Sequence, residues 1–400
     1  MIDLDNTSFD RCIKCTVCTA YCPVARVTPL YPGPKYSGPD AERMRIKTPF
    51  LADGSLAYCN NCKRCETVCP SGVRITDFIS LARSDRLKKR HRIRDFLLAH
   101  TDLAGFFATR LSGMANAVLN LKVVKTALRL FLNISSAIRF PAYAKGSFAK
   151  QLAAESDIQK KFPEQVLYFY GCYVNYNFHG LGRDVVAVLN AMNVGVTAPP
   201  QKCCGVPLIA AGNLARAKKN AADNIRSLTD AVKKRDRKIV FSSSSCILTV
   251  QHDYPELLDM DTSTIDDRIE FITRFIYKKF KAGGAPPMKP LDITAAYHSP
   301  CHLERTGGVM YTIGMLRRIP GLRLVLLHSE CCGLAGTYGF KKEFETIARD
   351  IGLPLFRQIQ AAAPDVVITD CEACKWQIEA NTGIRVLHPV SVLAMALKPS

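Results

Sequence analysis

The residues of this chain best suited to chemistry are cysteines in two runs near its N-terminus. Residues 59–70 read Cys-Asn-Asn-Cys-Lys-Arg-Cys-Glu-Thr-Val-Cys-Pro, and residues 12–23 repeat this spacing of cysteines before a proline. Thiolates are soft ligands that suit iron. Three of them at x2 spacing converge on one [4Fe–4S] cubane, while the fourth reaches another cluster. The spacing therefore predicts two interlocked cubanes, with expected ligands Cys12, Cys15, Cys18 and Cys69 for the first, and Cys22, Cys59, Cys62 and Cys65 for the second.

Zinc is the alternative for these runs, because C-x2-C pairs also build zinc sites. Two four-cysteine runs that both end in proline favour iron–sulfur clusters. The chain holds 17 cysteines in 400 residues, and their clustering at metal-ligand spacings argues against a disulfide scaffold. Its first residues, Met-Ile-Asp-Leu-Asp, lack the basic and apolar regions of a signal peptide, so we expect a reducing cytoplasm.

An internal repeat fills the C-terminal half of the chain. From about residue 166, β-like and helix-like segments alternate, which predicts an α/β fold. The expected strands are 166–170, 194–197 and 238–241 in the first copy, and 293–297, 322–327 and 365–369 in the second. The cysteines recur 129 residues apart at 172 and 301, and 128 residues apart at 204 and 332 and at 246 and 374. Because each cysteine group follows an expected strand, all should gather at the carboxyl edge of a parallel sheet, where ligands bind.

The second copy of the repeat has more thiols than a single metal centre needs. Its five cysteines are Cys301, Cys331, Cys332, Cys371 and Cys374. The first copy has Cys172, Cys203, Cys204 and Cys246, with Ser243 at the position of Cys371. Serine is a hard ligand that seldom replaces thiolate, so we expect a third centre in the second copy and an impaired or absent one in the first. Buried structural cysteines are the alternative for both copies.

These patterns divide the chain into four expected parts. Residues 1–82 should form a two-cluster, ferredoxin-like α+β domain of helices and loops, and residues 83–160 a basic amphipathic helical segment. Residues 161–290 and 291–400 are the two tandem Cys-Cys-Gly repeats, which together make an α/β domain of parallel sheets. Four hundred residues suffice for two or three domains with substantial cores.

The helical segment is strongly basic within a chain whose net charge is +19. Residues 81–150 contain fourteen Lys or Arg against three acids. Apolar residues recur at near-helical spacing in residues 95–140, which predicts basic amphipathic helices on a membrane surface or a membrane-bound partner. The alternative is that their apolar face packs on the protein's own core. No stretch reaches the roughly 18 uncharged apolar residues of a bilayer span. Signatures of a nucleic-acid partner are missing.

Other residues near the cysteines have simpler structural explanations. We interpret Lys14, Lys63 and Arg64 as solvated surface charges. We interpret His298 and His302 as satisfied structural histidines, and we expect Trp376 to pack over the site. The chain lacks a complete dinucleotide fingerprint and a Walker loop. Any flavin therefore belongs to a partner.

The two cysteine runs followed by two Cys-Cys-Gly repeats resemble the iron–sulfur subunits of heterodisulfide reductase, glycolate oxidase and related respiratory oxidoreductases. The chain is most similar to the membrane-anchoring iron–sulfur subunits of anaerobic glycerol-3-phosphate dehydrogenases. The segments that carry this likeness are 12–45, 58–71, 171–177, 203–210, 331–343 and 369–379. The resemblance implies that the eight cysteines of the N-terminal runs hold the two cubanes. It also implies a non-cubane [4Fe–4S] centre in the second repeat, whereas Ser243 departs from the pattern in the first.

The resemblance further implies a peripheral protein on the cytoplasmic face of the inner membrane. There it would anchor flavin-bearing dehydrogenase subunits and pass their electrons to the quinone pool in anaerobic glycerol metabolism. The chain would then be a non-flavin electron-transfer subunit of an oxidoreductase. The alternative is the iron–sulfur subunit of a related glycolate or lactate oxidase, or of a heterodisulfide-reductase-like complex. A zinc-stabilised interaction module is a third possibility.

Overall fold

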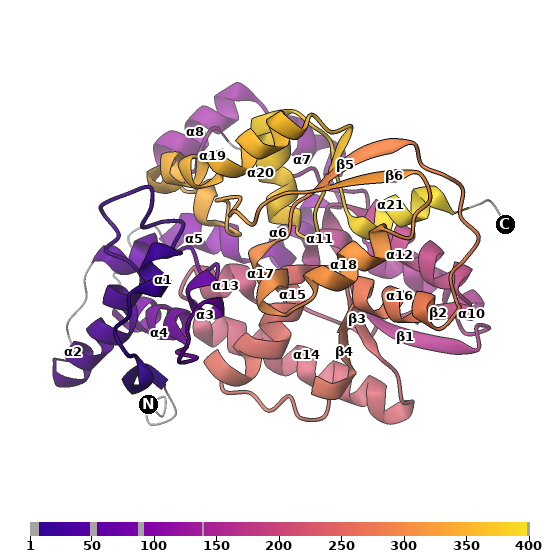
Figure 1. Ribbon diagram of the computed structural model, residues 1–400, viewed down its shortest axis with the longest axis horizontal. Coiled ribbons are helices and arrows are strands. Elements are labelled where there is room, and N and C mark those ends of the chain that lie inside the picture. Colours follow the sequence, from indigo (N-terminus) through magenta and orange to yellow (C-terminus); the bar gives the residue numbers. More distant parts are fainter. Residues whose placement is uncertain (1–7, 49–53, 87–91, 138–139, 398–400) are drawn as a thin grey trace.

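The computed structural model describes residues 8–48, 54–86, 92–137 and 140–397 (Figure 1). Its N-terminal part contains helices and turns, with no strand among the residues described there. The α-helices are α1 (Val17–Ala20), α2 (Ala41–Lys47), α3 (Arg64–Thr67) and α4 (Ile75–Arg86). The helices and loops expected of a two-cluster domain are therefore present, without the strands of an α+β class.

The two cysteine runs share one backbone conformation. Lys14 and Thr16 have positive φ in the first run, and Asn61 and Lys63 have positive φ at the equivalent places in the second. These left-handed residues turn the chain tightly just before α1 and α3, and positive φ is uncommon for residues other than glycine. α1 and α3 then lie against each other, which brings the two runs together.

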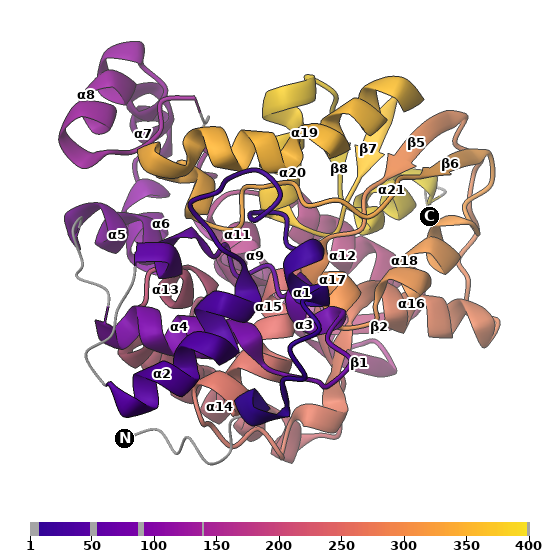
Figure 2. The ribbon, with the colours of Figure 1, turned by 60° about the vertical axis from the view of Figure 1, so that its left-hand side comes forward.

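A helical segment connects the cysteine runs to the sheets. Its helices are α5 (Arg92–Ala99), α6 (Thr101–Ala108), α7 (Ser112–Leu119), α8 (Lys122–Leu132), α9 (Phe148–Ala154) and α10 (Ser156–Gln159). α6 packs closely on the first repeat at Gly105, where a β-carbon would lie 2.4 Å from the Tyr176 ring. α7 and α8 bury none of their residues and project at one edge of the molecule (Figure 2). α6 packs on the first repeat at Gly105 but also exposes Leu103, Phe106 and Phe107, whereas α7 and α8 bury no residue, so neither interpretation accounts for the whole segment.

The first repeat is a four-stranded parallel sheet with strand order β2-β1-β3-β4. Its strands are β1 (Glu164–Phe169), β2 (Val194–Thr197), β3 (Ile239–Phe241) and β4 (Ile269–Phe271). Its helices are α11 (Gly171–Tyr176), α12 (His179–Ala191), α13 (Val206–Ala210), α14 (Leu214–Lys234), α15 (Ser244–Leu248) and α16 (Ile272–Lys281). The strand at 194–197 is where the sequence predicts it. β4 is a further buried strand that the sequence did not predict, because three residues carry little periodicity.

The second repeat has the same topology, β6-β5-β7-β8, and all its pairs are parallel. Its strands are β5 (Ile293–Tyr297), β6 (Leu322–Leu326), β7 (Val366–Ile368) and β8 (Val386–Leu387). Its helices are α17 (Cys301–Arg305), α18 (Val309–Leu316), α19 (Glu345–Ala362), α20 (Glu372–Thr382) and α21 (Pro389–Ala396). The predicted internal repeat is thus present as two equivalent parallel sheets.

The last helix of each repeat packs on a helix of the other repeat. α21, which follows the fourth strand of the second repeat, packs on α12 of the first, and α16 of the first repeat packs on α18 of the second. Buried threonines join the latter pair, since the hydroxyls of Thr273 and Thr312 lie 2.7 Å apart. One continuous hydrophobic core includes residues of both sheets. The carboxyl ends of all the cysteine-bearing strands are held in fixed relation by this reciprocal packing.

Candidate iron–sulfur centres

A first ring of thiols forms in the N-terminal part from both cysteine runs. Its members are Cys12, Cys15, Cys18 and Cys69, which line one small cavity together with apolar residues such as Val73 and Ile75. Burial raises the pKa of the Cys18 thiol, and the neighbouring thiols of the ring raise it further. Cys69 comes from the second run, so the ring is closed across the two runs as the spacing predicts.

A second ring, Cys22, Cys59, Cys62 and Cys65, lines a separate small cavity beside Tyr31 and Asn60. Burial raises the pKa of Cys22 to about 12, with Cys59 among the further causes. Four adjacent thiolates in an apolar wall would repel one another, and a cationic iron core relieves that repulsion. Each ring offers four soft donors close together, which is the donor set of a [4Fe–4S] cubane.

The second repeat gathers five thiols at the carboxyl edge of its sheet. Cys301 begins α17 after β5, the Cys331–Cys332 pair follows β6, and the remaining two, Cys371 and Cys374, lie at the start of α20 after β7. Hydrogen bonds from the thiols of Cys301 and then Cys332 lower the pKa of Cys331 well below its usual range. Hydrogen bonds to Cys332 and Cys371 raise the pKa of Cys374. The five thiols therefore form a continuous series of neighbours, from Cys301 through Cys331, Cys332 and Cys374 to Cys371.

The glycine of the second Cys-Cys-Gly motif is required by packing. Gly333 has φ +87°, and a β-carbon there would lie 1.9 Å from the carbonyl oxygen of Ala348 on α19. Its N–H points to the Cys331 sulfur at 3.4 Å. The motif thus brings the backbone against α19 and aims one N–H at a thiol.

The first repeat brings its four cysteines together in the same way. Cys172, Cys203, Cys204 and Cys246 follow its first three strands. Hydrogen bonds from Cys172 and then Cys204 lower the pKa of Cys203. Ser243 is the N-cap of α15: its hydroxyl accepts the Cys246 N–H at 3.3 Å and donates to both carboxylate oxygens of Glu372 at 3.2 Å. The expected weaker centre here has four thiols and a capping serine.

Asp102 is a residue near this site that the sequence did not single out. Its carboxylate accepts the backbone N–H of Cys203 at 2.7 Å, although it belongs to α6 in the preceding segment. Burial raises the pKa of Asp102 to about 7, and the charge of Cys203 adds to this effect. The only signal in the sequence is that Asp102 is the last acid before a long acid-free stretch.

The second ring adjoins the thiols of the second repeat. The charge of Cys62 raises the pKa of Cys301, after the hydrogen bond to Cys331, burial and the charge of Cys331. The Asn60 side-chain nitrogen lies 3.9 Å from the sulfur of Cys331. Cys331 also belongs to the same hydrophobic cluster as three cysteines of the second ring. The cysteine runs and the second repeat therefore form one continuous assembly of thiols.

The interpretation of Lys63 and Arg64 as solvated charges is wrong. Lys63 is 2% exposed and pairs with Asp77 at 3.1 Å and with Asp253 of the first repeat at 2.9 Å. Arg64 donates to the carbonyl oxygen of Ser329 at 2.9 Å, in the loop before Cys331. These cations are withdrawn from solvent because they attach the second cysteine run to both repeats. Lys14 is exposed, as expected.

Of the two histidines near these thiols, His302 is a satisfied structural histidine, as the sequence predicts, whereas the same prediction is wrong for His298, which is buried without a hydrogen-bond partner among the described residues. His302 contacts the hydroxyl of Ser245 at 3.0 Å and the carbonyl of Asn61 at 3.3 Å, so it joins the second run to the first repeat. Burial lowers the pKa of His298 to about 4, and neither of its ring nitrogens has a partner among the described residues. Trp376 packs edge-on against Tyr173, with ring centres 5.4 Å apart.

The thiols do not have the geometry of a mononuclear site. In the part of the chain that the structure describes, no three His, Cys, Asp or Glu residues are grouped closely enough to hold a single metal ion. A cubane takes one thiolate at each of its four irons, whereas zinc gathers all four donors at a single ion. All seventeen cysteines are free thiols. None of the described helices combines the length and hydropathy that a bilayer span requires.

Comparison with known proteins agrees with a division of the chain into an N-terminal two-cluster part and two cysteine-rich repeats. Residues 8–73 match the model of a 4Fe-4S dicluster domain, and residues 166–251 and 295–379 each match that of a cysteine-rich domain. The C subunit of the anaerobic glycerol-3-phosphate dehydrogenase of Escherichia coli K12 is 47% identical over 395 residues, which cover 98% of this chain and 100% of that protein. The chain belongs to this family.

More distant relatives share the architecture. The B subunit of the CoM/CoB fumarate reductase of Methanothermobacter marburgensis is 26% identical, over 98% of this chain and 73% of its own. The D subunit of the dihydromethanophenazine:CoB–CoM heterodisulfide reductase of Methanosarcina barkeri is 23% identical, over 92% and 87%. A hypothetical protein from Helicobacter pylori has a similar fold, with a TM-score of 0.50 at 11% identity over 93% of this chain and 69% of its own. The resemblance inferred from the cysteine motifs is confirmed.

Proposed function

We propose that this protein is the iron–sulfur electron-transfer subunit of an anaerobic respiratory glycerol-3-phosphate dehydrogenase complex. It takes electrons from partner flavin subunits and delivers them to a membrane quinone. The observation that carries this proposal is the contact between the second ring and the second repeat, where Asn60 beside Cys59 reaches Cys331. An unbroken series of thiol rings is what stepwise electron transfer requires, because the cofactors carry the electrons while the protein sets their distance and surroundings.

The cofactors we propose are two [4Fe–4S] cubanes and one non-cubane iron–sulfur centre. The first cubane would be held by Cys12, Cys15, Cys18 and Cys69, the second by Cys22, Cys59, Cys62 and Cys65, and the third centre by Cys301, Cys331, Cys332, Cys371 and Cys374. When bound, these groups supply one-electron redox chemistry. Cys172, Cys203, Cys204 and Cys246 form a fourth group of thiols, in which Ser243 stands where the second repeat has Cys371.

The chain's own residues adjust this chemistry by charge and by exclusion of water. Arg64 is a largely buried cation beside Cys62 and Cys331, and positive charge near a cluster favours its reduced form, whereas the charge of Lys63 is neutralised by Asp77 and Asp253. Most cysteines of the second ring and of the second repeat belong to apolar clusters that limit the access of solvent, whereas Cys15 of the first ring is exposed. Electrons would thus pass from the second cubane to the second repeat through protein that limits the access of water.

The exposed apolar residues of α7 and α8 support contact with a membrane. Val123 and Phe131 on α8 are 80% and 82% exposed, beside the basic residues Lys122 and Lys125. Exposed apolar groups next to cations fit an anionic lipid surface. We therefore propose peripheral attachment to the cytoplasmic face of the inner membrane through these helices.

The test is the choice of electron donor by the purified complex with its flavin subunits. Glycerol 3-phosphate should reduce the clusters, as measured by EPR under anaerobic conditions, whereas glycolate and lactate should not. Reduction by glycolate or lactate alone would favour the related oxidases instead. A colourless protein that contains zinc and no iron would exclude electron transfer.

A further inference from the structure

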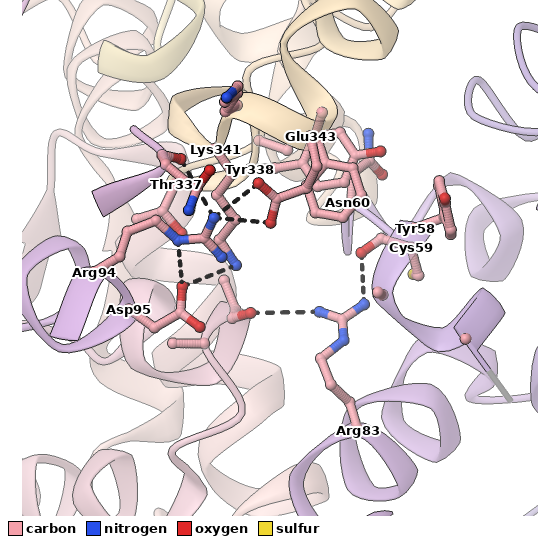
Figure 3. Close-up of a pocket in the computed structure, with 18 of the residues that line it drawn as sticks. Tyr58, Cys59, Asn60, Arg83, Arg94, Asp95, Thr337, Tyr338, Lys341 and Glu343 are labelled. Atoms are coloured by element: carbon pink, nitrogen blue, oxygen red, sulfur yellow. Dashed lines mark hydrogen bonds and ion pairs between the residues drawn. The ribbon is translucent and has the colours of Figure 1, made fainter. Parts of the chain in front are cut away.

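A cavity of about 820 Å³ lies between the second cysteine run, the helical segment and the second repeat (Figure 3). Sites for small molecules commonly have volumes of about 300–1,000 Å³. Its walls include Cys59 of the second ring with the adjacent Asn60, Arg94 from α5, Arg129 from α8, and a stretch after the Cys-Cys-Gly of the second repeat. A ligand in this cavity would therefore touch the second ring and the base of the helices that expose apolar residues.

The cavity contains cations whose charge is only partly neutralised. The Arg94 guanidinium lies 3.0 Å from a carboxylate oxygen of Asp95, and it also donates to both carboxylate oxygens of Glu343 at 2.8 Å (Figure 3). The Arg83 guanidinium donates to the carbonyl oxygens of Leu56 and Cys59 and pairs with no carboxylate among the described residues. Arg83 therefore leaves a positive charge beside the backbone of a proposed cluster ligand.

Aromatic rings form another wall of the cavity. Tyr338 and Phe344 stack with ring centres 4.4 Å apart and planes 8° apart, and Tyr58 meets Phe344 edge-on at 5.5 Å. The Tyr338 hydroxyl is buried and has no hydrogen-bond partner among the described residues. Buried hydroxyls are rarely left without a partner, so this one indicates a ligand that accepts its hydrogen bond.

Lys341 supplies a second donor with a different environment. Burial lowers the pKa of its ammonium group, the Asp95 carboxylate at 3.6 Å opposes this effect, and Arg94 reinforces it. An ammonium with a lowered pKa gives up its proton more readily than an exposed lysine does. The cavity thus combines a flat aromatic wall, a cation without a carboxylate partner and two donors.

We propose that this cavity binds the head group of a membrane quinone. The proposal rests on the electron-transfer function above and adds the place where electrons leave. A quinone ring is flat, its two carbonyl oxygens accept hydrogen bonds, and its apolar tail can leave toward α5 and α8. The residues assigned to the head group are Tyr338 and Lys341 as donors and Arg83 as the nearby positive charge.

The surroundings of the cavity can supply the electrons and protons that reduction of a quinone requires. A quinone becomes a quinol when it takes up two electrons and two protons, one on each carbonyl oxygen. The electrons arrive singly from the Cys59 side. One proton comes from the Lys341 ammonium and the other from solvent water, and solvent then restores the proton of Lys341. The Tyr338 hydroxyl keeps its proton and positions one oxygen, because burial raises its pKa.

Direct binding is the test. The full-length holoprotein, in detergent, would be irradiated with an azido-benzoquinone that carries a decyl tail, and labelled peptides would be identified by mass spectrometry. We expect label on the segments around Tyr58 and Tyr338–Phe344. Lys341→Gln and Tyr338→Phe should each weaken the binding of decyl-benzoquinone about tenfold, the loss for one hydrogen bond in a dry site.

Lys281→Gln on α16 is the matched control, since that lysine is exposed and lies outside the cavity. All three variants should retain the dithionite-reduced EPR spectrum of the wild type, which shows that they fold and keep their clusters. Label confined to other segments, or affinities unchanged in both cavity variants, would overturn the proposal. So would displacement of the probe by glycerol 3-phosphate, because that would make the cavity an anion site. Reduction of the clusters by glycerol 3-phosphate, measured separately, decides the proposed function whatever this experiment shows.

Discussion

The side-chain amide of Asn60 lies 3.9 Å from the sulfur of Cys331, although 271 residues separate them in the chain. Asn60 follows Cys59 of the second ring, and Cys331 belongs to the second repeat. The side-chain N–H of Asn60 therefore links the neighbourhood of the second ring to the thiols of the second repeat, which the sequence presents as separate sites. A hydrogen bond to a cluster sulfur stabilises the reduced state, so this contact should affect redox potential.

Replacement of Asn60 by alanine should lower the reduction potential of the centre in the second repeat. A hydrogen bond of ordinary strength contributes about 1 kcal/mol, which corresponds to a shift of about 40 mV in a one-electron couple. Redox titration followed by EPR measures the shift. An unchanged potential would mean that the amide does not interact with the metal-bound sulfur.

Cys371→Ser should remove one EPR-visible centre and leave both cubane signals. The substitution gives the second repeat the same residue that the first repeat has at Ser243. Serine is a harder ligand than thiolate, so the iron content should fall while the N-terminal rings stay intact. Simultaneous loss of the cubane signals would show that the eight-cysteine partition is wrong.

Ser243→Ala should cost about 1 kcal/mol of stability, the usual loss for a helix N-cap, and leave the iron content unchanged. The physical reason is that the Ser243 hydroxyl caps α15 and contacts Glu372. Chemical denaturation and iron analysis measure the two quantities. Loss of iron in this variant would identify Ser243 as a ligand.

Replacement of Val123 and Phe131 by serine should move the protein from the membrane to the soluble fraction. Loss of two apolar groups that enter the lipid interface would cost about 3 kcal/mol or more, roughly a hundredfold in partitioning. Deletion of residues 96–140 is a less specific test, since it also removes Asp102, which holds Cys203. Met310→Ser is the control, because Met310 is 70% exposed on α18. If the wild type, the α8 variant and the control sediment equally with membranes, α8 is not the attachment site.

His388 should make the protein less stable in acid. It is buried as a neutral imidazole, with Nε2 donating to the Ser242 carbonyl at 2.9 Å and Nδ1 accepting the Val390 N–H at 3.2 Å. Burial lowers the pKa of His388 from its ordinary 6.5 to about 4. Between these pH values the unfolded chain binds a proton that the folded protein does not. The free energy of unfolding should therefore fall by up to about 3 kcal/mol as the pH decreases to 4.

His388→Asn retains an N-cap for α21 and removes this titration. Unfolding measured at several pH values should show a shallower loss of stability in the variant than in the wild type. His298 is also buried with a lowered pKa and remains in both proteins, so its contribution cancels in the comparison. Parallel pH profiles would contradict the role given to His388.

Local sequence determined much of the arrangement within each unit. The two sets of four cysteines that the spacing predicts are the sets that the structure brings together, because x2 spacing on a tight turn places three thiols around one point. The strands at 194–197 and 293–297 were predictable from their apolar runs and the internal repeat. The short strands β4 and β8 were not, since two or three buried residues have no periodicity that the sequence reveals.

Only the tertiary structure decided how the units meet. No spacing rule places Asn60 beside Cys331, and none brings the Lys63 ammonium to Asp253 of the first repeat. The same holds for the proposed quinone cavity, whose walls come from three distant segments of the chain. The physical reason is that metal-ligand spacing and strand periodicity are short-range properties. Burial of a charge or closure of a cavity depends instead on which surfaces pack together.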